Sequence, residues 1–125
     1  MLKFRRNKMT KSLNIKRNKL ILESIIFTEV MGKFCKGLTE KSLLNTRDNL
    51  ELCIAKLPEL VNDYNSNEDR LSRLRNLVQI QALLDECKDY LDFISRTRQA
   101  DTKPAARELT KFLRKFEQAN RSFIN

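Results

Sequence analysis

The sequence predicts an all-α protein, an up-down-up-down four-helix bundle preceded by a basic N-terminal arm. Its 125 residues fit a single domain, and only two glycines and two prolines interrupt the chain. β-Sandwiches and barrels need turn residues far more often. Apolar residues recur instead at helical spacing in four segments joined by short loops, which make neighbouring helices antiparallel. We expect the arm over residues 1–17 and the bundle over residues 18–125.

The first two expected helices cover about residues 18–36 and 40–64. Gly37 is expected to end the first helix in the left-handed conformation, and Thr39 to cap the start of the second. Pro58 falls inside the second helix, where its missing amide donor should bend the helix. The seam of this helix consists of apolar residues at heptad spacing, namely Leu43, Leu50, Ile54, Leu57, Val61 and Tyr64.

The third and fourth expected helices begin at recognisable caps. Ser66 and Asp69 resemble a capping box at the start of the third helix, which covers about residues 68–98. Asp101 or Thr102 is expected to cap the fourth helix. The expected seams are Leu74, Leu77, Ile80, Leu84, Cys87, Leu91 and Ile94 in the third helix and Leu109, Phe112, Leu113 and Phe116 in the fourth.

The third helix also carries a second apolar face. Leu71, Val78 and Phe93 point away from the main seam at about 100° per residue. A single bundle does not cover such large apolar side chains, whereas a neighbouring subunit does. We therefore expect a homo-oligomer with these three residues at its interface.

Positive charge is concentrated at the start of the chain. The net charge is +9, and residues 1–22 contain eight basic side chains and no acidic one. Such a segment repels itself, extends and attracts polyanions. A solubilising leader without a specific partner and a transit peptide are the alternatives.

The outer face of the fourth helix is a second basic surface. Arg107, Lys111 and Arg114 lie within about 60° of one another, and cations on this face can neutralise several phosphates. An ordinary solvated helix face is the alternative interpretation. The nucleic-acid-binding residues that we expect are Arg5, Arg6, Lys16, Arg17, Lys19, Arg70, Arg73, Lys103, Arg107, Lys111, Arg114, Lys115 and Arg121.

Catalytic and metal-binding constellations are absent from the sequence. The chain has no histidine, no phosphate-binding loop and no dinucleotide-binding glycine pattern. Its three cysteines, Cys35, Cys53 and Cys87, form no CxxC pair, and their spacing is typical of core residues in a reducing compartment. The acidic residues between 85 and 92 are typical of a solvated helix face. We expect no catalytic residue, no cofactor and no metal.

No segment approaches the roughly 18 consecutive apolar residues that a membrane span requires, because acidic residues interrupt the run from Leu20 to Met31. We therefore expect no membrane partner and a cytoplasmic location.

Two stretches resemble a known family. The segment NLELCIAKLPELVNDY, with its Leu57-Pro58 pair, resembles the four-helix-bundle proteins encoded by intervening sequences in bacterial 23S rRNA genes. The segment RLSRLRNLVQIQALLDECKDYLDFI is similar to the related accessory variability determinants of diversity-generating retroelements, with matching positions at Arg70, Leu71, Leu74 and Arg75. The resemblance covers about residues 20–122. It implies a basic homopentamer that binds a reverse transcriptase and its template RNA.

Two hypotheses about function follow. The first is a non-catalytic, nucleic-acid-binding accessory protein that binds RNA and a reverse transcriptase and so supports complementary-DNA synthesis in a diversity-generating retroelement. The alternative is a helical adaptor whose partner is a protein with an acidic surface. An enzyme with its own active site ranks third, because no catalytic constellation is recognisable.

Overall fold

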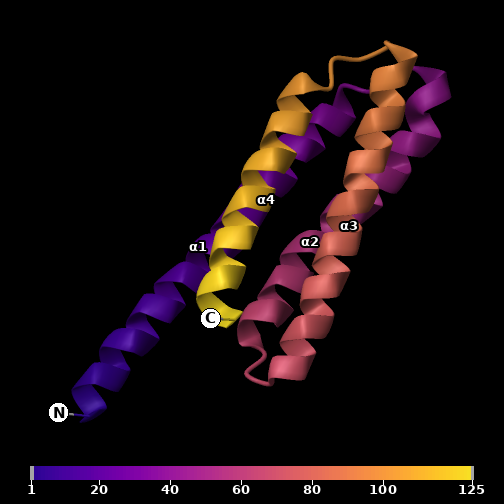
Figure 1. Cartoon of the computed structure of the whole chain (residues 1–125). Helices are drawn as coiled ribbons and strands as arrows, with labels where there is room; N and C mark the ends of the chain where they lie inside the picture. Colours follow the sequence, from indigo (N-terminus) through magenta and orange to yellow (C-terminus); the bar gives the residue numbers. More distant parts are fainter. Residues whose placement is uncertain (1, 125) are drawn as a thin grey trace.

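The chain forms four long α-helices that pack as a bundle (Figure 1). The computed structural model describes the backbone of residues 2–124 and the side chains of residues 19–121. Within that part the structure is helical, without a strand, as the sequence predicts. The elements are α1 (Leu2–Lys36), the 3₁₀ turn η1 (Lys41–Leu43), α2 (Leu44–Ser66), α3 (Arg70–Thr97) and α4 (Lys103–Ile124).

Helix α1 begins sixteen residues earlier than the sequence analysis predicts, at Leu2. The backbone of the basic arm is therefore helical instead of extended, and Figure 1 shows the first half of α1 projecting beyond the other helices. Helix α1 contains no proline, and its first glycine is Gly32. Because Lys, Arg, Leu and Met all favour helix, charge repulsion alone does not prevent it.

The connection between α1 and α2 corrects two expectations. The Gly37 amide donates to the Lys33 and Phe34 carbonyls and ends α1, but no described glycine has a positive φ. Helix α2 begins at Leu44, after η1, and not at residue 40. Leu38 and Leu43, which lie on either side of Thr39, are both buried in the core, and neither η1 nor α2 starts with a side-chain cap from Thr39.

At the starts of α3 and α4 an aspartate carboxylate accepts a hydrogen bond from a backbone amide. The Asp69 carboxylate accepts the Ser72 amide at 3.2 Å, so Asp69 itself is the N-cap of α3 and no capping box with Ser66 forms. Ser66 belongs to the last turn of α2 instead. Asp101 accepts the Lys103 amide at 3.1 Å at the start of α4, as predicted.

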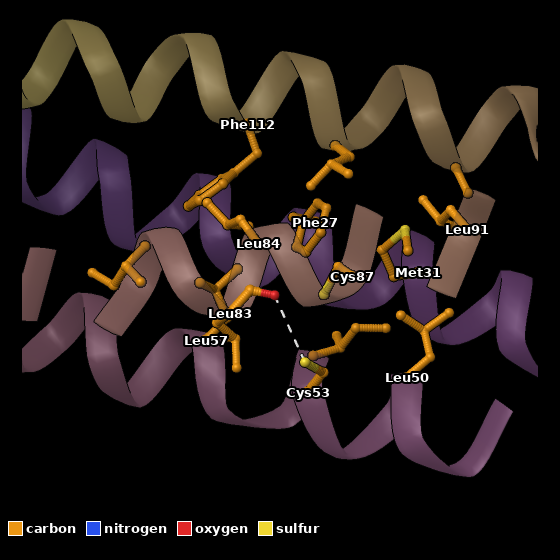
Figure 2. Close-up of a cluster of buried hydrophobic side chains, with 14 of the residues drawn as sticks. Phe27, Met31, Leu50, Cys53, Leu57, Leu83, Leu84, Cys87, Leu91 and Phe112 are labelled. Atoms are coloured by element: carbon orange, nitrogen blue, oxygen red, sulfur yellow. Dashed lines mark hydrogen bonds between the residues drawn. The ribbon is translucent and has the colours of Figure 1, made fainter. Parts of the chain in front are cut away.

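The core confirms most of the predicted seams. The heptad positions of α2 are all buried, and Figure 2 shows side chains from all four helices meeting in one cluster. The rings of Phe27 in α1 and Phe112 in α4 lie 5.4 Å apart, which aligns these two helices. Leu74 is an error of the prediction, because it is 38% exposed. It lies six residues before Ile80 and so about 120° away from the centre of the core face.

The four helices do not pack equally closely. Helix α2 contacts both α1 and α3 extensively, and α1 also packs against α4, whereas α3 and α4 are the least closely packed of the four neighbouring pairs. The outer faces of α3 and α4 are both exposed to solvent. These two faces are the surfaces that the sequence analysis singled out.

Candidate nucleic-acid interface

The outer face of α4 carries a stripe of exposed cations. The core side of this helix is fixed by its buried apolar residues, including Phe112 and Phe116. Helical periodicity then turns the opposite side chains to solvent. The exposed cations on this face are Lys103, Arg107, Lys111, Arg114 and Arg121. They extend over about 27 Å of helix at the usual rise per residue.

A shallow groove of about 700 Å³ follows this face of α4. Ala106 and Thr110 leave space between the longer side chains, and the Thr110 hydroxyl donates to the Ala106 carbonyl at 3.0 Å. The groove is lined by Lys103, Ala106, Arg107, Thr110, Lys111, Arg114, Lys115 and Gln118. Long cationic side chains thus flank a depression with little bulk at its floor, which leaves room for a backbone of phosphates.

Lys115 differs from the other cations of the groove because it forms an ion pair with Glu23 of α1. Its side chain is 33% exposed, and that of Glu23 is 12% exposed. The contact connects α4 to α1 beside the Phe27–Phe112 ring pair. A paired cation has less charge to offer a ligand, so Lys115 is the weakest of the predicted α4 contacts.

The remaining cations of the groove have no such partner. Within residues 19–121 the ion pairs are Arg47 with Asp48 and Lys115 with Glu23. The acidic residues of α4 lie at the margins, with Glu108 half-buried and Glu117 exposed. Five exposed cations of α4 therefore keep their charge available to an anion in solution.

The other predicted contacts are only partly brought to this surface. Lys19 is exposed and lies one turn before Glu23, on the side of α1 that faces α4. Arg70 is exposed and Arg73 half-buried at the start of α3, and neither lines the groove. The expectations for Arg5, Arg6, Lys16 and Arg17 concern side chains outside those that the structure describes.

Sequence reasoning missed four residues of this surface. Ala106, Thr110 and Gln118 carry no charge and so give no signal for an anion site, although helical spacing places them on the cationic face. Glu23 lies ninety-two residues before Lys115, and only the packing of α1 on α4 brings the two together.

The three cysteine thiols are buried in the core. Burial, with a contribution from Glu51, raises the pKa of Cys35 to about 12. The pKa of Cys53 is raised by its hydrogen bond with Cys87, by burial and by Glu86. Its Sγ donates to the Glu86 carboxylate at 3.0 Å and lies 3.7 Å from the Leu83 carbonyl, the contact drawn in Figure 2. All three cysteines are buried, as predicted, and the raised pKa values keep the Cys35 and Cys53 thiols protonated at neutral pH.

No group of three or more cysteine, aspartate or glutamate side chains among the described residues is placed to hold a metal ion. No helix in the same part of the chain is long and apolar enough to cross a membrane.

The fold and the charge distribution define a basic four-helix bundle with an open cationic groove along one outer helix. Comparison with protein families, with curated proteins and with solved structures finds no match to this chain.

Proposed function

We propose that the protein binds RNA through the outer face of α4 and acts as a non-catalytic accessory protein beside a reverse transcriptase. The observation that carries the RNA-binding proposal is the groove whose exposed cations have no ion-pair partner among the described residues. Cations that are free in the unbound protein release phosphate counterions when they bind, which favours association. The reverse transcriptase rests on the family resemblance alone.

The proposal concerns the phosphate backbone and not the base sequence. The groove lies on a single helix, and its lining includes no aromatic side chain on which a base could stack. Arginine and lysine at this spacing contact phosphates by charge, so binding should depend steeply on salt and little on sequence.

The test is filter binding of a single-stranded RNA oligonucleotide at several salt concentrations. The variant Arg107→Gln/Lys111→Gln/Arg114→Gln removes three phosphate contacts, which lowers the magnitude of the salt slope by about 2. Between about 50 and 200 mM salt, the intact protein then loses about 18-fold more affinity than the variant. Deleting residues 1–17 tests the arm separately and should flatten the salt dependence further.

The matched control is Lys41→Gln/Lys56→Gln/Lys88→Gln, which removes the same charge from exposed lysines outside the groove. This control should keep the slope of the intact protein. An equal loss of slope in both variants would show that net charge, and not the groove, attracts RNA. Absence of RNA binding at low salt would refute the proposal and leave the adaptor with an acidic protein partner in its place.

The proposed reverse transcriptase partner has its own test. A reverse transcriptase gene beside the gene for this protein would supply the enzyme, and the two purified proteins should then associate. Failure of that enzyme to bind the intact chain would refute this part of the proposal while leaving RNA binding intact.

A further inference from the structure

The outward face of α3 presents an apolar stripe to solvent. Leu71, Val78 and Phe93 are 57%, 64% and 48% exposed, and Ala82 is also exposed. At about 100° per residue these four side chains lie within about 60° of one another. The stripe extends over about 33 Å of helix. The predicted exposure of this second apolar face is therefore confirmed.

Two pairs of residues on this face are placed symmetrically about Ala82. Leu71 lies eleven residues before Ala82, and Phe93 lies eleven residues after it. Arg75 lies seven residues before and Asp89 seven residues after, and both are exposed on the same face. Leu71 and Phe93 thus match in apolar character and Arg75 and Asp89 are opposite in charge, whereas the position that mirrors Val78 holds the exposed Glu86.

We infer that the face of α3 binds a second copy of this chain through an antiparallel α3 pair whose twofold axis passes beside Ala82. In this register Leu71 of each copy lies opposite Phe93 of the other, and Arg75 lies opposite Asp89. Ala82 of each copy lies opposite Ala82 of the other at the crossing point, and Val78 of each copy lies between Ala82 and Glu86 of the other. The small Ala82 side chain lets the two helices approach closely. Every contact occurs twice, as a twofold interface requires.

Charge decides the orientation of the two copies. A parallel α3 pair in register would place Arg75 against Arg75 and Asp89 against Asp89, which like charges disfavour. The antiparallel pair replaces both repulsions with attractions, while burial of the apolar side chains supplies the stability. This arrangement closes with two subunits, unlike the five-subunit ring that the family resemblance implies.

A second exposed apolar patch serves as the natural comparison. Leu22, Ile25 and Ile26 of α1 are exposed, but they cover little more than one helical turn. A stable interface needs a much larger contact area, and the α3 stripe is several times longer than this patch. Leu22, at 56% exposed, matches the α3 residues in exposure and is the control position.

The test is the mass of the full chain by light scattering at tens of micromolar. The intact protein and the control Leu22→Arg should both show twice the 14.8 kDa chain mass. Ala82→Arg places two cations and added bulk at the crossing point and should give the monomer mass. Circular dichroism should stay unchanged, because Ala82 is exposed in the folded chain.

Charge reversal tests the register independently of packing. Arg75→Asp alone and Asp89→Arg alone each break two ion pairs per dimer and should raise the dissociation constant about tenfold. The double variant Arg75→Asp/Asp89→Arg should restore the value of the intact protein. A monomeric or five-subunit intact protein, a dimeric Ala82→Arg variant, or no rescue by the double variant would each overturn the inference.

Discussion

In the RNA-binding mode that we propose, the ion pair between Glu23 and Lys115 determines how many cations of α4 are free to contact phosphates. Glu23→Gln keeps the shape of the side chain but releases Lys115, so the free cations of the helix rise from five to six. For single-stranded RNA each additional contact steepens the salt slope by about 0.7. Between about 50 and 200 mM salt, the variant should therefore lose about 2.6-fold more affinity than the intact protein.

Removing the lysine should have a different effect. Lys115→Gln deletes a cation that Glu23 already neutralises, so the salt slope should stay at the value of the intact protein. The double variant Glu23→Gln/Lys115→Gln should also return to that value. Filter binding at four or more salt concentrations measures all three slopes, and circular dichroism checks that each variant folds.

Salt slopes that change by equal and opposite amounts in Glu23→Gln and Lys115→Gln would refute this reasoning. Glu23→Gln raises and Lys115→Gln lowers the net charge by one, so a protein that binds RNA through net charge alone would show equal and opposite changes in slope. The ion pair is partly exposed, and its loss should cost no more than about 1 kcal/mol of stability. An unfolded variant would therefore also contradict this interpretation of the contact.

Three further predictions concern stability and reactivity. Asp69→Ala should lower the midpoint of urea unfolding near neutral pH, because the N-cap of α3 is lost. Hydrogen bonds from Ser72 lower the pKa of Asp69 in the folded protein, so the charge-dependent part of this difference should be full above about pH 4 and be lost as pH falls through the lowered pKa. The Cys35 thiol, with a pKa of about 12, should react with a disulfide reagent at pH 8 only as fast as the protein unfolds. Pro58→Ala should not lower the midpoint of thermal unfolding, because Pro58 lies inside α2 and alanine restores an amide donor there.

Periodicity predicts the side of a helix that becomes buried but not the details of its ends. The apolar spacing correctly placed the core residues of α2 and the outward position of Leu71, Val78 and Phe93. The start of α1 and the 3₁₀ turn before α2 were missed. Both depend on competition between local propensity and the demands of packing, which one-dimensional patterns do not resolve.

The candidate groove was predictable in part for the same reason. A single helix carries its cations, so spacing alone grouped Arg107, Lys111 and Arg114 correctly. The neutralisation of Lys115 depends on which helix lies beside α4 and at what register, and no local signal in the sequence contains that information.

The two proposals, RNA binding and pairing through α3, are connected by symmetry. The twofold axis of the antiparallel pair is perpendicular to the plane that contains the two α3 helices. Rotation about it exchanges the two copies but keeps each flanking helix on the same side of that plane. Both α4 helices would then lie on one side of the dimer and both α2 helices on the other. Ten exposed α4 cations on one side could engage one long RNA at two places, which raises affinity by effective concentration without any new contact. A short oligonucleotide that occupies one groove would gain nothing from the pairing. The shortest RNA whose affinity is lower for the Ala82→Arg variant than for the intact protein therefore reports the separation of the two grooves.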